Sequence, residues 1–149
     1  MGQARNPADG ADAVRMVTLT LPADHDYLGF ARTSAMHVAS LLFFPLPRVN
    51  DLRLAVDEAC TSFLQAGWDE PADADGAIPA SEDTMTLQYD RFPASLHVTV
   101  SAKVPGGWPR RDELGWAMLS SLVGDVQVDR RDGVGALTLI VPLPTAAVG

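Results

Sequence analysis

The hydrophobic patterns along this 149-residue chain predict a two-layer α/β (α+β) sandwich with a mixed, mostly antiparallel sheet and three helices on one face. Three observations lead to this fold class. Five short segments alternate apolar and polar residues, as half-buried strands do. Three longer segments repeat apolar residues at helical spacing. The patterns follow the order β-α-α-β-β-α-β-β, with no repeat and no linker long enough to separate two domains.

The first half of the chain contains one predicted strand and two predicted helices. Residues 15–21 alternate as a strand that ends at Pro22. A helix capped by Asp24 or Asp26 should run to about Leu42. The stiff, proline-containing connector 43–47 follows. A second helix should begin at residue 50 or 51 and end at residue 66, before a glycine, and an exposed loop should cover residues 68–83.

The second half predicts two hairpins around a short helix. Segments 84–92 and 95–102 alternate as strands joined by a tight turn, and segments 126–130 and 136–143 are joined by Asp132-Gly133. Between the hairpins lie a loop over residues 103–111 and a helix over residues 112–122. Polar residues at alternate strand positions predict that the other sheet face meets water; they are Thr86, Gln88, His97, Thr99, Gln127 and Asp129.

Composition limits the classes of function. The net charge of −8 argues against direct nucleic-acid binding, because phosphate recognition needs a positive surface. No apolar run is long enough to span a membrane and no signal peptide is recognisable, so we expect a cytoplasmic protein without a membrane partner. The single cysteine, Cys60, lies in an apolar helical pattern and should be buried and inert. The three histidines of the chain do not have the spacing of metal ligands, so no metal site is expected. We expect a disordered leader at 1–13, one domain at 14–143 and a flexible tail at 144–149.

The second predicted helix contains the most informative segment. Residues 51–62 read DLRLAVDEACTS. This segment closely resembles the ATP-binding helix of RsbW-type anti-sigma-factor serine kinases, whose pattern is D-L-x-L-A-V-x-E-A-C-T-N. Only the last position differs, where Ser62 replaces Asn. The tripeptide Phe30-Ala31-Arg32 matches an F-A-R or similar tripeptide on the family's partner-binding helix. The resemblance covers about residues 14–143 and implies a GHKL, Bergerat-type ATPase-like fold.

The resemblance also implies an ATP site that has degenerated. In the family the residue at Glu58 is the base for a serine hydroxyl, and the Asn replaced by Ser62 holds Mg²⁺, for which a hydroxyl is a poorer ligand. The D-x-G-x-G motif is replaced by SAKVPGG at 101–107, without the acid that recognises adenine. One glycine survives of the third motif, within ELGW at 113–116. The residues that would remain at this degenerate site are Glu58, Ser62, Gly106, Gly107 and Gly115. We therefore expect ATP and Mg²⁺ binding to be weak or absent.

By this resemblance the protein is an anti-sigma factor that inhibits an alternative sigma factor of the SigB/SigF type and is countered by a STAS-domain anti-anti-sigma factor. Phe30 and Arg32 would contact these partners, and the family's habit of pairing implies a homodimer. Two alternatives remain open: an active serine/threonine kinase that phosphorylates its STAS antagonist, and a GHKL-fold module for another partner. The residues also have ordinary interpretations, because Glu58 and Arg32 are common on helix surfaces and Gly106-Gly107 is typical of a turn.

Overall fold

A computed structural model describes residues 13–68, 83–109 and 114–145, leaving out the side chains of 65–68 and 114–116. Nearly all of the predicted leader, most of the loop 68–83 and most of the tail therefore lie outside the described residues. The elements are β1 (Val14–Pro22), a 3₁₀ turn (His25–Tyr27), α1 (Leu28–Leu41), α2 (Leu46–Trp68), β2 (Thr84–Arg91), β3 (Ser95–Lys103), α3 (Leu114–Leu122), β4 (Asp125–Arg131) and β5 (Val134–Pro142). Their order is the predicted one.

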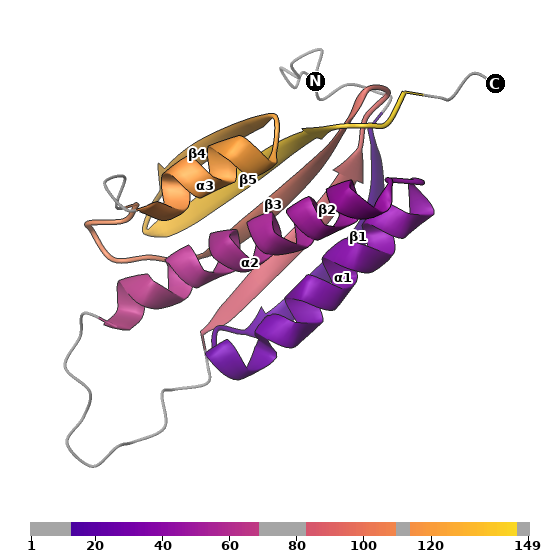
Figure 1. Cartoon of the computed structure of the whole chain (residues 1–149). Coiled ribbons are helices and arrows are strands. Elements are labelled where there is room, and N and C mark those ends of the chain that lie inside the picture. Colours follow the sequence, from indigo (N-terminus) through magenta and orange to yellow (C-terminus); the bar gives the residue numbers. More distant parts are fainter. Residues whose placement is uncertain (1–12, 69–82, 110–113, 146–149) are drawn as a thin grey trace, which may run out of the picture.

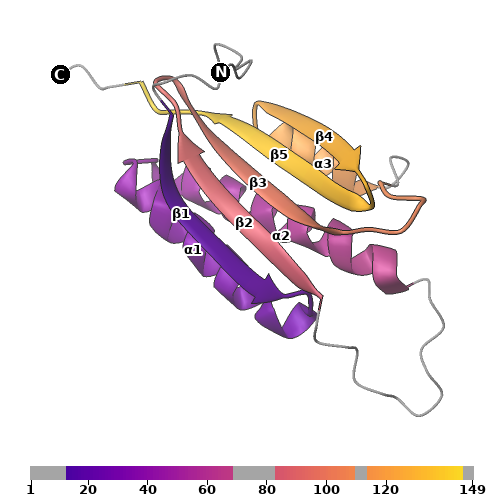
Figure 2. The ribbon, with the colours of Figure 1, turned by 180° about the vertical axis from the view of Figure 1, so that it is seen from behind.

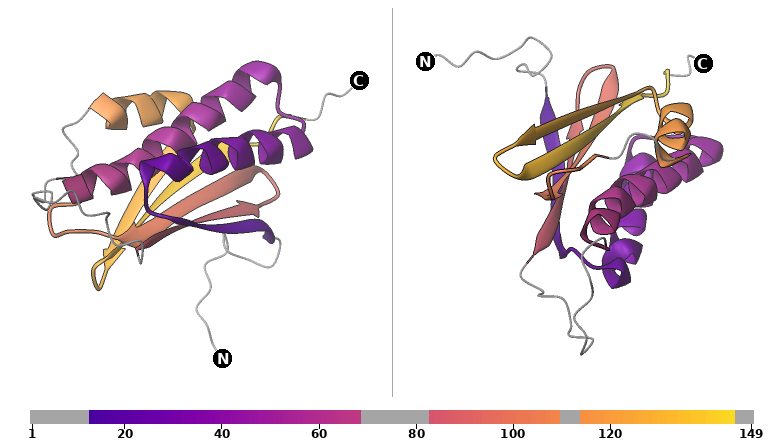
Figure 3. Two further views of the ribbon diagram at one scale, coloured as in Figure 1. Left: turned by 90° about the horizontal axis from the view of Figure 1, so that it is seen from below. Right: turned by 90° about the vertical axis from the view of Figure 1, so that its left-hand side faces the viewer.

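The sheet has the strand order β1-β2-β3-β5-β4, and α1, α2 and α3 lie together on one of its faces (Figures 1 and 3). Every neighbouring pair of described strands is antiparallel, so the prediction of a mixed sheet was wrong. The reason is topological. The α3 crossover joins β3 and β4, which run in the same direction, but β5 lies between them and is antiparallel to both.

The core lies between the helical layer and the sheet. Alternate residues of β2, β3 and β5 are buried against the helices, and Tyr89, Leu96 and Leu137 are completely buried. The other sheet face, seen in front of the helices in Figure 2, is polar and half-buried or exposed, as predicted. Threonine hydroxyls pair across its strands, Thr20 with Thr86 at 3.3 Å and Thr99 with Thr138 at 3.1 Å.

Both long helices start at residues other than those predicted. The Asp24 carboxylate accepts a hydrogen bond from the backbone N–H of Asp26 at 2.8 Å, but it caps the 3₁₀ turn, and α1 begins only at Leu28. Helix α2 begins at Leu46, about one turn before the predicted position. Pro47 is tolerated there because the first N–H groups of a helix have no intrahelical acceptor, so a proline loses nothing.

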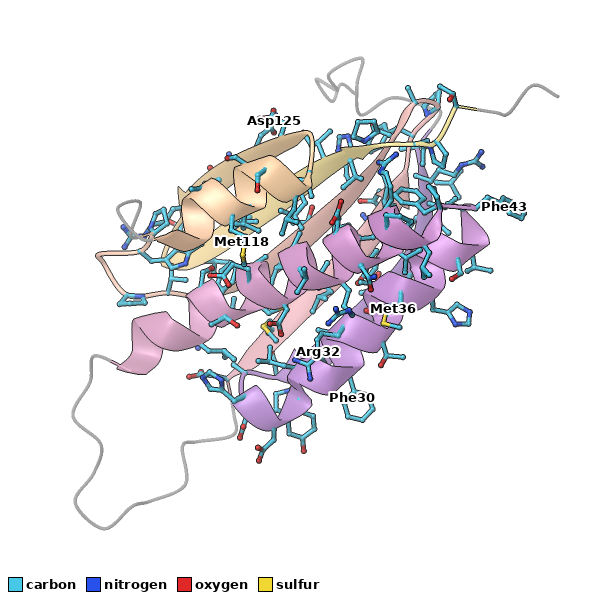
Figure 4. All side chains as sticks on the ribbon, in the orientation of Figure 1. Phe30, Arg32, Met36, Phe43, Met118 and Asp125 are labelled. Carbon is cyan, nitrogen blue, oxygen red and sulfur yellow. The ribbon has the colours of Figure 1, made fainter. Side chains whose placement is uncertain are left out.

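The turn between α1 and α2 holds Phe43 in the left-handed region, with φ 63°. The N–H of Phe43 donates to the carbonyl of Ser40 at 3.1 Å, and the N–H of Phe44 donates to that of Ala39 at 3.0 Å, which is the Schellman pattern of helix ends. Glycine usually occupies this position. The Phe43 side chain is 86% exposed and projects from the end of the helical layer (Figure 4).

Candidate functional site

Arg32, the predicted partner-binding arginine, connects the two long helices. Its Nη1 atom donates to Oδ1 of Asp57 on α2 at 2.8 Å. The two side chains keep 40% and 32% of their surface exposed, so the ion pair is accessible from the helical side of the molecule. Asp57 directly precedes Glu58 in the motif of α2. The sequence did not reveal this pair, because the packing of α1 against α2 decides which residues of the two helices meet.

Phe30 lies on another side of α1. Its side chain is 59% exposed, and its ring stacks on that of Tyr27 at a centroid distance of 6.0 Å. In Figure 4 the Phe30 ring points away from the contact between α1 and α2, whereas Arg32 and Met36, one turn apart, lie along that contact. Met36 is 39% exposed. The structure therefore presents Phe30 and Arg32 on nearly opposite flanks of one helix, on either side of the buried Ala31, and does not bring them into contact.

Glu58 and Ser62 stand one turn apart on α2, as their spacing predicts, and both are half-buried. The Ser62 hydroxyl donates to the carbonyl oxygen of Ala59 at 2.8 Å, within its own helix. This bond holds the short side chain against the helix backbone. An asparagine at position 62 would reach further from the helix than this serine.

The end of β3 has an apolar residue where the resemblance expects the adenine-binding acid. The sequence left open which of Ser101, Ala102 and Lys103 faces the helices. The structure places Ala102 on that face, where it is 9% exposed, and the pleat turns its two neighbours to the opposite face. Ala102 is paired with Gly135 of β5. Neither side chain has a hydrogen-bonding group.

The two loop glycines form an exposed turn. Neither Gly106 nor Gly107 has a positive φ, and a Cβ on Gly107 would meet nothing within 4 Å. Arg130 donates from Nη1 to the Gly106 carbonyl at 3.1 Å, which attaches the loop to β4. Gly115 lies in the first turn of α3, and the residues just before it, 110–113, lie outside the described residues. Nothing in the described geometry requires glycine at 106 or 107, which agrees with the interpretation as a turn.

Trp108 occupies the region between the motif end of α2 and the paired strands β3 and β5. It is 4% exposed and stacks on Phe63, the residue after Ser62, at a centroid distance of 4.8 Å. It also approaches Gly135 so closely that a Cβ there would lie 2.6 Å from a ring carbon. Its buried Nε1 has no hydrogen-bond partner within the described part of the chain. From the sequence, Trp108 could be expected only to be buried, as most tryptophans are. The glycine at position 135 was the one residue that could have indicated where the indole packs, and it was not recognised as such.

Two other ionisable groups are buried in the core. Burial, with a smaller contribution from the charge of Asp57, raises the pKa of the Cys60 thiol from 9.0 to about 12. The thiol is therefore uncharged and unreactive, as predicted. Burial also raises the pKa of Tyr89, whose hydroxyl lies 2.7 Å from that of Ser34. Among the described residues no three His, Cys, Asp or Glu side chains form a group that could hold a metal ion. The described helices include none with the length and apolar character needed to cross a membrane.

Comparisons with known proteins agree with this architecture. No family model matches the chain. The serine-protein kinase RsbW of Bacillus pumilus is 26% identical over 141 residues, which cover 83% of each chain. The RsbW of Bacillus subtilis is 26% identical over 134 residues, covering 79% of this chain and 80% of its own. A crystal structure of the RsbU and RsbW domains of Rv1364c from Mycobacterium tuberculosis has the same fold, with a TM-score of 0.56, 15% identity and coverage of 86% of this chain and 33% of that longer one. The chain is thus similar to RsbW serine-protein kinases over most of its length, and it shares the fold of the structure that contains the RsbW domain.

Proposed function

We propose that this protein is an anti-sigma factor that binds and inhibits an alternative sigma factor of the SigB/SigF type without productive ATP binding. A STAS-domain anti-anti-sigma factor competes for the same protein and releases the sigma factor. In this proposal the protein acts in the cytoplasm, pairs as a homodimer and binds neither nucleic acid nor a membrane. The observation that carries the proposal is a contrast between two regions along α2. At one, the Arg32–Asp57 ion pair is accessible and has exposed neighbours. At the other, beyond Ser62, the surroundings are apolar and occupied by the buried Trp108.

The α1–α2 region has the character of a protein-binding surface. Arg32 offers a planar guanidinium that one carboxylate already orients while 40% of the side chain stays exposed. Phe30 and Met36 add exposed apolar surface on the same helix. Interfaces are enriched in arginine, aromatic residues and methionine, and a few such residues supply most of the binding energy.

The residues at the other region do not fit a bound ATP with its Mg²⁺. The side chain facing the helices at the end of β3 is Ala102, which cannot accept a hydrogen bond from the adenine amine. An unmet polar group in such a place costs on the order of 1–3 kcal/mol. The hydroxyl of Ser62 already donates within the helix, and Mg²⁺ prefers well-placed oxygen ligands from carboxylates and carbonyls. Release of the sigma factor would then depend on competition between partners and their concentrations.

The test begins with the companions of the protein in its own host. The tagged protein is purified, and proteins recovered in stoichiometric amounts are identified by mass spectrometry. A sigma factor or a STAS-domain protein in the eluate supports the proposal. If neither is recovered under conditions where both are expressed, the proposed function is wrong.

The same complex then tests the assignment of Arg32. We expect Arg32→Ala to weaken sigma binding by about 2 kcal/mol or more, the threshold for a hot-spot residue. Arg131→Ala is the matched control, because this arginine of β4 has a side chain 79% exposed and only a 3.6 Å ion pair with Asp129. Asp57→Asn removes the internal ion pair and keeps the arginine. Sigma binding by Arg32→Ala that stays within about 0.5 kcal/mol of the unchanged protein would contradict the assignment.

A second candidate function is an active serine/threonine kinase. It is favoured by the curated names of the relatives, which are serine-protein kinases, and by the half-buried Glu58 one turn before Ser62. Radiolabelled ATP and the STAS partner distinguish the two functions. Phosphoserine that accumulates with the unchanged protein and is abolished by Glu58→Ala would establish kinase activity. It would also contradict the proposal that the protein acts without productive ATP binding.

A further inference from the structure

We propose that Trp108 is a built-in occupant of the place where the family resemblance puts the adenine base, so that its indole ring and a purine nucleotide exclude each other. This inference deepens the nucleotide part of the proposed function. Its test uses small ligands only, so its failure and a failure of sigma binding can be told apart.

The contacts of Trp108 mark its place. The ring stacks on Phe63, which directly follows the former metal-binding position Ser62 on α2. The ring also lies against Gly135, which is paired with Ala102 at the position expected for the adenine-binding acid. The indole therefore lies beside the end of the α2 motif and beside the strand that pairs with the end of β3, the two segments to which the resemblance assigns nucleotide-binding residues.

Gly135 makes this placement possible. A Cβ at position 135 would lie 2.6, 2.8 and 3.0 Å from three carbon atoms of the Trp108 ring, closer than real side chains approach. The Phe63 ring, stacked on the indole at a centroid distance of 4.8 Å, is a second close neighbour that limits how far the indole can shift. Any larger residue at 135 would therefore have to displace the indole. Glycine and tryptophan at these two positions form a matched pair.

The residues around the indole suit a planar ring that needs few hydrogen bonds. An indole and a purine are both flat, fused two-ring systems that stack on an aromatic residue. The segments described here offer Phe63, Ala102 and Gly135, and the buried Nε1–H of the indole has no hydrogen-bond partner within the described residues. Most buried donors in proteins do have an acceptor, so this one shows how few acceptors these segments provide. The amine of an adenine would meet the same shortage, so the emptied place should accept indole more readily than adenosine.

The experiment removes the indole ring by substitution and measures which ligands then bind. Isothermal titration measures indole, adenosine and Mg-ATP with the unchanged full-length protein, with Trp108→Gly and with Phe44→Ala. Phe44 is 6% exposed at the α1–α2 turn, so its replacement removes a buried aromatic ring from the other end of α2. We expect the unchanged protein to bind none of the three ligands saturably up to about 1 mM. Trp108→Gly should bind indole at least about tenfold more tightly than either other protein, and more tightly than it binds adenosine.

If Trp108→Gly folds poorly, indole is added and refolding of the variant is followed by circular dichroism. Indole that restores the fold of Trp108→Gly and not that of a destabilised Phe44→Ala supports the proposal. Trp108→Gly that binds indole no better than Phe44→Ala overturns it. Saturable binding of Mg-ATP to the unchanged protein, with no change in tryptophan fluorescence, also overturns it, because the nucleotide and the buried indole would then coexist.

Discussion

Replacing Gly135 by alanine tests the contact on which the interpretation of Trp108 depends. The added Cβ would lie 2.6 Å from a ring carbon, and the stacked Phe63 ring limits how far the indole can shift. Overpacking of a core typically costs about 1–3 kcal/mol. Complete expulsion of the indole would approach the about 3–5 kcal/mol lost when a buried aromatic residue is truncated. We therefore expect Gly135→Ala to lower the free energy of unfolding by about 2–3 kcal/mol.

A double-mutant cycle shows whether that cost comes from Trp108. Urea unfolding, followed by circular dichroism, is measured for the unchanged protein, Gly135→Ala, Trp108→Gly and the double variant. Without the indole, the three atoms closest to the alanine Cβ are gone, so Gly135→Ala should cost less than about 0.5 kcal/mol in the Trp108→Gly background. An equal cost in both backgrounds would refute the reasoning, as would a Gly135→Ala protein as stable as the unchanged one.

Three further predictions concern other features of the fold. Phe43→Gly should stabilise the protein by about 0.5–1 kcal/mol in urea unfolding, because it relieves the left-handed backbone at φ 63° and removes a side chain that is 86% exposed. Cys60, whose pKa rises from 9.0 unfolded to about 12 folded, contributes stability that is complete below pH 9 and is lost as the pH rises towards 12. The free energy of unfolding should fall by about 1 kcal/mol between pH 9 and 10 from this group, because the unfolded thiol is half ionised at pH 9 and mostly ionised at pH 10, and Cys60→Ala should remove that fall. Arg32 and Asp57 should show a coupling of about 0.5–1 kcal/mol in a double-mutant cycle, reduced by salt because both side chains are partly exposed.

Each of these has a control and a contradicting result. Phe43→Ala keeps the left-handed strain and should be close to neutral, so equal stabilities of the alanine and glycine variants would contradict the backbone argument. A slope between pH 9 and 10 that persists in Cys60→Ala would assign the titration to another group. A coupling between Arg32 and Asp57 that is unchanged in 1 M salt would show that the pair does not act through screened charges.

The sequence by itself determined the order of the elements, the turn chemistry and the identity of the buried strand faces. These features depend on local rules. Alternation with period 2 assigns Met85 and Leu87 to the core face, and the Asp132-Gly133 turn has positive φ at both residues, 55° and 79°, as a tight hairpin turn requires. The motif on α2 likewise placed Glu58 and Ser62 one turn apart, because helical spacing is a local property.

The start of α2 and the direction of the sheet pairings needed more than local rules. The apolar connector allowed a helix from Leu46, but only its packing shows that the helix forms there. Strand directions depend on which strands become neighbours, and β5, the last strand in the chain, lies between β3 and β4.

Only the tertiary structure decided which distant residues meet at the candidate sites. Arg32 and Asp57 are 25 residues apart and pair because α1 packs against α2. Ala102 lies opposite Gly135 only because β5 pairs with β3 in the sheet. In the sequence, Trp108 resembles any core tryptophan. Its proposed role follows from its contacts with Phe63 of α2 and Gly135 of β5, which are far from it in the sequence. Such contacts arise from shape complementarity in a closely packed interior, and a single sequence has no local pattern that records it.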